Sequence, residues 1–257
     1  MLGKEIVLPD RAKWWVNMKL LEHFYQVGGN CLSHKYDASV YLIEGNNGLH
    51  LIECGTPDGI QKILENIRSM GFDPAQIEDI YATHGHYDHI GASAWMKKTY
   101  GCKLYVAEKD IQQVEEGDNI RTTAQILYDR EFEPCRVDQK LENGQTIDFG
   151  NSVSMEVIET PGHTQGSVCF SILSNGIRLL VAGDTVYGGF LPEIGSDIRQ
   201  WKQSMHLLTS RHFDAMTFGH IGPTLLCDAD ARLRELEMQL GVYYNPWFKA
   251  MKDSFRF

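Results

Sequence analysis

The 257-residue chain lacks the features that would place it in a membrane or on a secretory route. No run approaches the roughly 18 apolar residues that a membrane-spanning helix requires. Charged residues interrupt the apolar positions of the first fifteen residues, so these lack the continuous apolar core of a signal peptide. The six cysteines include no C-x-x-C pair, and we therefore expect reduced thiols in a cytoplasmic protein. Zinc bound by cysteine is the alternative, to which this spacing gives little support.

An excess of basic residues is also missing. The chain has 24 lysines and arginines against 34 aspartates and glutamates, a formal net charge of −10, and its basic residues form no cluster. Because binding to a phosphate backbone needs a basic surface, we expect no nucleic-acid partner and no membrane partner, but a small-molecule substrate. A hydrophobic content of 43% is ample for a sizeable core, and no linker marks a boundary, so residues 1–257 are predicted to form one domain.

The most informative segment runs from residue 83 to residue 89 and contains His84, His86, Asp88 and His89. Neutral imidazole nitrogens and carboxylate oxygens are the ligands that divalent metal ions prefer. His84 and His86 are two residues apart and would point the same way on an extended chain, whereas Asp88 and His89 follow a turn and would reach a second centre. We interpret this segment as a source of ligands for two metal ions, because four such side chains are rarely crowded together without a partner.

Three further polar residues, His163, Asp184 and His220, each come directly after a glycine that follows an apolar or β-branched run. This pattern is typical of a residue at the end of a strand, where the chain leaves the sheet for a loop. Taken alone, each histidine would be an ordinary buried or surface residue, and Asp184 a cap or turn residue. Together with the first cluster they predict a single polar site at one edge of a sheet.

The order H-x-H-x-D-H, then His, Asp and a final His, resembles the signature of the metallo-β-lactamase-fold hydrolase superfamily, from about Tyr41 to Pro223. The resemblance implies an α/β (α+β) fold, an αββα four-layer sandwich of two mixed β-sheets flanked by helices. It also implies the metal ligands: His84, His86 and His163 for the first ion, Asp88, His89 and His220 for the second, and Asp184 as the bridge between them.

This resemblance implies a hydrolase with two zinc ions, in which a shared hydroxide attacks an electron-poor carbonyl carbon. Asp88 would be both a metal ligand and the group that orients the attacking water or accepts its proton. Tyr187 lies three residues after Asp184, where N-acyl-homoserine lactonases carry a tyrosine that assists at the substrate carbonyl. Glyoxalase II has Phe at that point, so packing is the expected role of Tyr187 and catalysis the alternative.

Asp184 narrows the substrate class. Zinc β-lactamases of the superfamily place Cys or Ser at this point, whereas glyoxalase II-like thioesterases and lactonases place Asp. The favoured substrates are therefore lactones, thioesters or related esters and amides. Only 37 residues follow His220, fewer than the helical glutathione-binding domain of glyoxalase II needs, so we do not expect hydroxyacylglutathione as the substrate.

Two other functions stay open. Persulfide dioxygenases of the superfamily use one iron held by two His and one Asp, here His84, His163 and Asp184, so Fe²⁺ or mixed divalent metals are alternatives to zinc. The second of these other functions is that of a non-catalytic metal-binding protein. The complete ligand set argues against it, because a scaffold would not need the ligands of an open site.

Periodicity and turn residues predict alternating strands and helices. In the first half these are strands at 39–44 and 49–53 around an Asn-Asn-Gly turn, a helix at 60–70, a strand at 77–82, a helix at 92–100 and a strand at 103–107. In the second half they are strands at 145–149, 153–160, 168–173, 177–181 and 213–218, a helix capped by Asp197, and a last helix capped by Asp228 that ends near Gly241.

Two segments lie outside this scaffold. Residues 109–130 are polar, with apolar residues at helical spacing, and predict a helical insertion that is either a lid over the metals or a solvated outer helix. Residues 242–257 carry six aromatic side chains, which predicts that this tail docks on the body of the protein or on a second copy in a homodimer. Of these two, we expect docking on the body.

Overall fold

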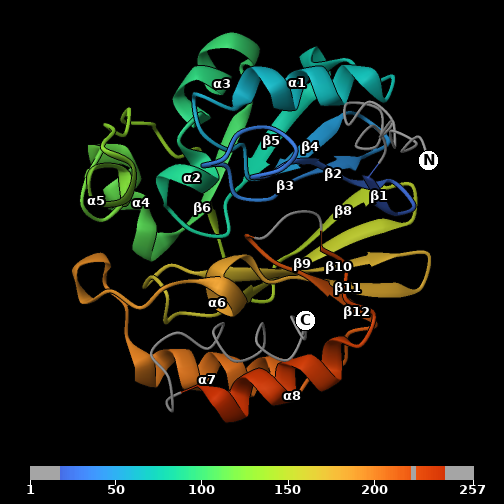
Figure 1. The fold of residues 1–257 in the computed structure, drawn as a ribbon. Coiled ribbons are helices and arrows are strands. Elements are labelled where there is room, and N and C mark those ends of the chain that lie inside the picture. Colours follow the sequence, from blue (N-terminus) through green and yellow to red (C-terminus); the bar gives the residue numbers. More distant parts are fainter. Residues whose placement is uncertain (1–17, 221–223, 241–257) are drawn as a thin grey trace, which may run out of the picture.

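The computed structural model describes residues 18–220 and 224–240. Two β-sheets face each other, with α1 (Ile60–Ser69) and α3 (Ser93–Tyr100) on the outer face of one sheet (Figure 1). On the outer face of the other sheet lie α7 (Ile198–Thr209) and α8 (Ala229–Gln239). The predicted αββα sandwich is confirmed.

The first sheet has seven strands in sequence order and is mixed. Its first four strands pair antiparallel, and the pairs from β4 to β7 are parallel. The strands are β1 (Met18–Leu21), β2 (Phe24–Gly28), β3 (Val40–Glu44), β4 (Leu49–Ile52), β5 (Ile77–Tyr81), β6 (Lys103–Ala107) and β7 (Gln139–Leu141). The parallel pairing places the ends of β5 and β6 at the same edge of the sheet.

The second sheet has five strands in the order β12-β11-β10-β9-β8. Its strands are β8 (Thr146–Gly150), β9 (Val153–Glu159), β10 (Val168–Ser174), β11 (Ile177–Val181) and β12 (Ala215–Thr217), and only the β11–β12 pair is parallel. The β10–β11 hairpin closes through Asn175 and Gly176, both with positive φ, as the tight turns that match strand twist require.

Buried apolar side chains fill all three spaces between the layers. One cluster packs α1 and α3 on the first sheet, a second joins the two sheets, and a third packs α7 and α8 on the second sheet. In the third cluster the Trp201 indole is fully buried and donates from Nε1 to the Thr185 carbonyl at 2.7 Å, which fastens α7 to the short helix α6 (Gly183–Tyr187). Among the described residues, no helix combines the length and apolar character needed to cross a bilayer.

The predicted strands and helices are present within a few residues, and the sequence misses three strands: β1, β2 and β7. The predicted insertion is two helices rather than one, α4 (Glu108–Glu116) and α5 (Ala124–Tyr128), because Gly117 turns into the left-handed region (φ 66°) and ends α4. The short helices not predicted are α2 (Tyr87–Ile90), α6, η2 (Pro74–Gln76) and η3 (Pro192–Ile194). The predicted docking of the tail at 242–257 lies outside the described residues.

The two predicted helix caps have different outcomes. The Asp197 side chain accepts from the backbone N–H groups of Arg199 and Gln200, as predicted. Asp228 precedes α8, but its side chain caps no backbone group, so that prediction is wrong. Its backbone (φ −114°, ψ 40°) is not in the extended conformation of a capping residue, and its carboxylate instead accepts from Arg232 Nε at 3.1 Å.

We expect Asp197→Ala to lower the Tm by roughly 2–4 °C, because two backbone donors of α7 lose their acceptor. Asp228→Ala is the matched control and should change the Tm by less than about 1 °C, since it removes only an exposed ion pair. Thermal unfolding followed by circular dichroism measures both. Equal shifts in the two variants would contradict the difference in capping.

Candidate metal centre

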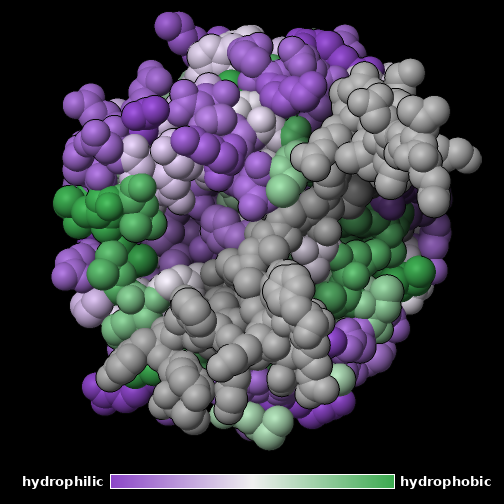
Figure 2. All heavy atoms as spheres, in the orientation of Figure 1, coloured by the Kyte–Doolittle hydropathy of each residue, from purple (hydrophilic) through white to green (hydrophobic). Residues whose placement is uncertain are grey.

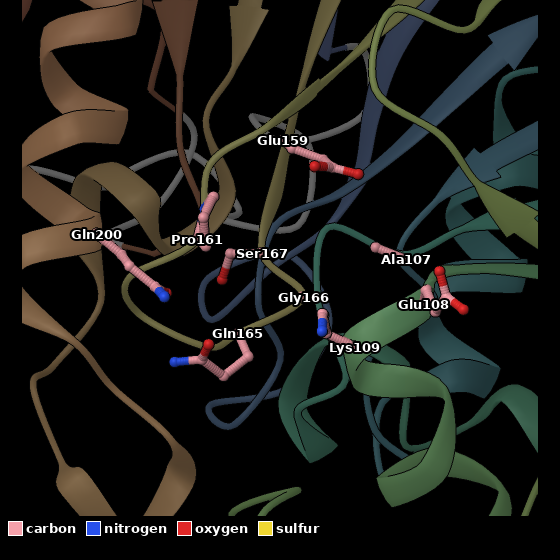
Figure 3. A pocket seen from close by; sticks show the side chains of 9 residues that line it. All are labelled: Ala107, Glu108, Lys109, Glu159, Pro161, Gln165, Gly166, Ser167 and Gln200. Atoms are coloured by element: carbon pink, nitrogen blue, oxygen red, sulfur yellow. The ribbon is translucent and has the colours of Figure 1, made fainter.

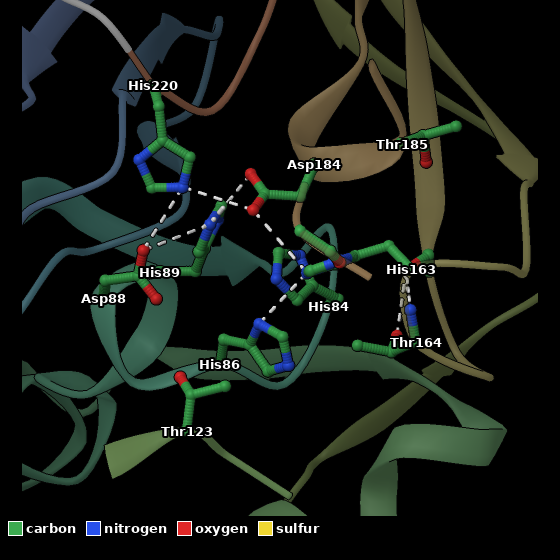
Figure 4. A network of polar contacts seen from close by, with 12 residues as sticks. His84, His86, Asp88, His89, Thr123, His163, Thr164, Asp184, Thr185 and His220 are labelled. Carbon is green, nitrogen blue, oxygen red and sulfur yellow. Dashed lines mark hydrogen bonds and ion pairs between the residues drawn. The ribbon is translucent and has the colours of Figure 1, made fainter. Parts of the chain in front are cut away.

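All seven predicted ligands converge at one edge of the sandwich (Figure 4). They come from four loops, which follow β5, β9, β11 and β12, so each sheet contributes. Strand β5 ends at Tyr81, and His86 precedes α2 with an extended backbone. Asp88 and His89 then face the site from α2. The prediction that these residues lie at strand ends and meet in one place is confirmed.

The first set is His84, His86 and His163, whose ligating nitrogens all lie within 4.8 Å of one another. His86 Nδ1 and His163 Nε2 are 3.2 Å apart, and all three side chains are buried. Burial lowers the pKa of each of them, well below the usual value for His84 and His86. They are therefore held as neutral imidazoles, the form that binds metal ions.

The second set is Asp88, His89 and His220, which also offer ligand atoms within 4.8 Å of one another. Asp88 Oδ2 lies 3.4 Å from His220 Nε2 and 3.6 Å from His89 Nε2. The His220 side chain is 26% exposed, whereas Asp88 and His89 are almost fully buried. Solvent therefore reaches the second set from the His220 side.

The Asp184 carboxylate lies between the two sets. Its Oδ2 is 3.5 Å from His163 Nε2 and 3.2 Å from His220 Nε2, and its Oδ1 is 3.3 Å from His89 Nε2. Burial raises the pKa of Asp184, but His220 and His89 outweigh it and hold the pKa well below its usual value. An ionised carboxylate in contact with both sets has the position that a bridging ligand needs.

The site also contains buried polar atoms that make no hydrogen bond: His84 Nε2, His86 Nε2, His89 Nε2 and Asp184 Oδ1. Buried polar atoms nearly always have a partner, so this set of imidazole nitrogens and a carboxylate oxygen fits a divalent cation as their common partner. Although burial lowers the pKa of His89 and His220, the surrounding carboxylates outweigh it and raise both, so the carboxylates favour a proton on each of these imidazoles. A divalent cation would replace those protons, and the residues fit such an ion.

Glu53, a residue that the sequence places in a strand without a role, orients one of the predicted ligands. Its Oε1 lies 3.1 Å from His89 Nδ1 and accepts from the Thr83 N–H. Because this carboxylate contacts Nδ1, the other ring nitrogen of His89, Nε2, faces the predicted metal site. Metal-binding histidines are usually held in this way. One feature of the sequence could have pointed to Glu53: it directly follows the buried strand β4, just as the predicted ligands follow the strands that precede them.

Asp110 is the second residue that the sequence does not single out. Its side chain, 1% exposed, accepts from Gly85 N–H and Thr164 Oγ1 at one oxygen and from Gly166 N–H at the other, all at 2.9 Å. Gly85 lies between His84 and His86, and Thr164 follows His163, so Asp110 joins the two loops of the first set. Burial raises its pKa, and these three donors oppose that shift.

A cavity of about 190 Å³ lies between α7 and the beginning of α4 (Figure 3). Gln165 and Gln200 line it together with residues of the loop that carries His163, but none of the seven predicted ligands does. The cavity is therefore separate from the ligand cluster. Tyr187 is the last residue of α6, the helix that begins with Gly183 and Asp184.

We expect Asp110→Asn to lower the free energy of unfolding by about 1–3 kcal/mol, because the amide nitrogen cannot accept a hydrogen bond from the donors around it. Zinc affinity should also fall by about 10- to 100-fold, since both loops of the first set lose a common anchor. Urea denaturation and zinc titration measure the two effects. Asp138→Asn is the control: Asp138 accepts from Leu104 N–H and Lys97, away from the predicted ligands, and its loss should leave zinc affinity unchanged.

Comparison with known proteins agrees with this geometry. A probable metallo-hydrolase of Methanocaldococcus jannaschii is 27% identical over 192 residues, which cover 72% of this chain and 88% of that protein. The hydroxyacylglutathione hydrolase of Rhizobium meliloti is 27% identical over 161 residues, 62% of this chain but only 52% of that enzyme. The chain thus spans about half the length of this relative.

Solved structures show the same fold. BJP-1, a subclass B3 metallo-β-lactamase of Bradyrhizobium japonicum, has a TM-score of 0.73 over 95% of this chain and 99% of that chain, at 20% identity. The family model of the metallo-β-lactamase superfamily matches residues 35–220, which begin before β3 and end at the last predicted ligand. The chain belongs to the metallo-β-lactamase superfamily.

Proposed function

We propose that the chain is a hydrolase with two zinc ions that cleaves a small carbonyl substrate, a thioester or a lactone. His84, His86 and His163 would hold one ion, and Asp88, His89 and His220 the other, with Asp184 shared. The observation that carries the proposal is the pair of ligand sets on either side of Asp184, with buried nitrogens that make no hydrogen bond in both. One mononuclear site would leave the second set of buried groups unexplained.

When bound, the two ions would supply Lewis acidity, which lowers the pKa of a water molecule and stabilises negative charge on the substrate oxygen. The residues of the chain supply position and proton transfer. Asp88 is buried beside His89 and His220, where its carboxylate can orient the attacking water and accept its proton. Glu53 holds the ring of His89, and Asp110 holds the loops of the first set.

The relatives support carbonyl hydrolysis: one bears the name probable metallo-hydrolase, and another is a hydroxyacylglutathione hydrolase. The likeness to β-lactamase structures concerns the fold, because the identity is only 20%. Asp184, rather than Cys or Ser, supports a thioester or lactone over a β-lactam. Assistance by Tyr187 at the substrate carbonyl stays a prediction, as do the cytoplasmic location, the single domain and a homodimer.

Metal analysis tests the proposal directly. Protein produced in medium with both zinc and iron should contain about two zinc ions per chain and hydrolyse members of a panel of thioesters and lactones. Chelation should abolish the activity, and zinc should restore it. One iron per chain, with oxygen uptake on a persulfide substrate, would reject the hydrolase in favour of an oxidative enzyme.

Asp88→Asn should reduce kcat by about 100-fold or more, because the amide cannot accept the proton of the attacking water. The first set is untouched, so at least one metal ion should remain bound. Asp129→Asn makes the same change at an exposed residue and should leave kcat unchanged. Wild-type turnover in Asp88→Asn would show that the role given to Asp88 is wrong.

A further inference from the structure

The backbone just before β3 holds two residues of the second ligand set. The Ala38 N–H donates to the Asp88 carbonyl at 3.1 Å, and the Ser39 N–H donates to the Gly219 carbonyl at 2.7 Å. Gly219 directly precedes His220. Two neighbouring N–H groups therefore fix the backbone at or beside two predicted ligands, one from the loop after β5 of the first sheet and one from the loop after β12 of the second.

The backbone just after β4 holds the third residue of this set. The N–H groups of Cys54 and Gly55 both donate to the His89 carbonyl at 2.8 Å. Strands β3 and β4 pair antiparallel, so the residues before β3 and the residues after β4 lie at the same edge of the sheet. All three ligands of the second set are thus anchored at that edge to two segments, residues 37–39 and 54–56.

A buried carboxylate joins these two segments to each other. The pairing of β3 with β4 ends at Tyr41 and Ile52, so the strands themselves do not connect the segments. Asp37 Oδ1 accepts from the Thr56 N–H at 2.9 Å and from the Thr56 hydroxyl at 2.6 Å. Asp37 Oδ2 accepts from the Ser33 hydroxyl. The Asp37 side chain is therefore a direct link between the two segments that anchor the second set.

The Asp37 side chain is only 1% exposed, although a polar surface lies close by. The residues over α1, the helix that begins four residues after Thr56, are mainly hydrophilic in the surface view (Figure 2), and Lys35 is exposed. The packing around the carboxylate is close, because a Cβ on Gly59 would lie 1.8 Å from Asp37 Oδ2. Burying a carboxylate is costly unless donors compensate, so its three hydrogen bonds indicate that the fold uses Asp37 as a link and not as a surface charge.

We infer that Asp37 is a positioning residue for the second ligand set. The hydrogen bonds of its side chain go to Ser33 and Thr56, so it acts on the ligands through the backbone of the two segments and not by contact with them. This inference rests on the proposed function, in which the second set holds a metal ion. Asp37 would then do for the second set what Asp110 does for the loops of the first.

Loss of this link should affect the second set alone. Without it, the segment that holds Asp88 and the residue before His220 can shift relative to the segment that holds His89. Metal binding requires ligand distances within about 0.2 Å of their usual values, so even a small shift weakens the site. The first set is joined by Asp110 through a different pair of loops, and its geometry should persist.

The test measures cobalt binding to Asp37→Ala, which removes all three hydrogen bonds. The visible absorption of divalent cobalt depends on its ligands, so the bands lost in His220→Ala identify the second set, and those lost in His86→Ala the first. We expect Asp37→Ala to weaken cobalt binding at the second set by about 10- to 100-fold and to change its bands, with the first set unaffected. Asp110→Asn should weaken the first set instead.

Two further variants are the controls. Asp37→Asn keeps an oxygen for Thr56, but its amide nitrogen cannot accept from Ser33, so it should weaken cobalt binding at the second set by only about 3-fold. Asp138→Ala also removes a carboxylate that accepts from a backbone N–H, that of Leu104, away from the predicted ligands. It should leave cobalt binding at both sets unchanged. The Tm of every variant is measured alongside.

The outcomes separate this inference from the proposed function. Wild-type binding at the second set of Asp37→Ala, or equal weakening of both sets, would reject the inference whatever the change in Tm. If Asp37→Ala does not fold, Asp37→Asn decides, and unchanged binding at its second set would reject the inference. If the wild type binds cobalt at both sets but hydrolyses no thioester or lactone, the proposed function fails alone, and the cobalt affinities still decide the role of Asp37.

Discussion

The three hydrogen bonds of the buried Asp110 carboxylate are the constraint on which the site depends. They join a loop that follows β5 of the first sheet to a loop that follows β9 of the second, so that histidines from different layers face one space. The approach is close enough to require glycine at position 166, whereas at position 85 the nearest atom is the movable end of a side chain. A Cβ on Gly85 would lie 2.5 Å from Gln113 Nε2, and a Cβ on Gly166 would lie 2.6 Å from the Asp110 carboxylate. The glycines beside the ligands thus permit the backbone contacts that position the imidazoles.

This arrangement is costly when no ion is bound. Three imidazole nitrogens and one carboxylate oxygen are buried without hydrogen bonds, and each such atom destabilises the fold. The three apolar clusters between the layers oppose that cost. An ion that binds only the folded state would add about 2.7 kcal/mol of stability at 100 times its Kd. Stability and function are then linked through the same four atoms.

The fold and the convergence of the seven predicted ligands could be predicted from the sequence because their signals are local. Each signal lies within a few consecutive residues: the H-x-H-x-D-H segment, the Gly-His and Gly-Asp pairs, and the hairpin turns. The roles of Asp110 and Glu53 could not be assigned in this way, because their partners are distant in sequence: Asp110 contacts residues 25, 54 and 56 positions away. The short strand β7 escaped prediction because two of its three residues are exposed and polar, so no apolar alternation marks it. The prediction that Asp228 caps α8 was wrong because the backbone conformation at that residue, not the residue type, decides whether its side chain can accept from the N–H groups of the helix.

The similarity to BJP-1, 95% of this chain at 20% identity, shows that this scaffold tolerates almost complete change of sequence. The same fold therefore cannot determine the reaction, and the substrate must be argued from the groups that surround the ligands. The residues in and around the site lie on two kinds of structural element. The predicted ligands follow strands held by packed layers, whereas the exposed Ile126 and Leu127 stand on the short helix α5, outside the sheets. A change at these exposed residues would leave the hydrogen bonds of Asp110 to the loops of the first set intact. The surface beside the site can thus vary separately from the contacts that hold the predicted ligands, because different residues form each of them.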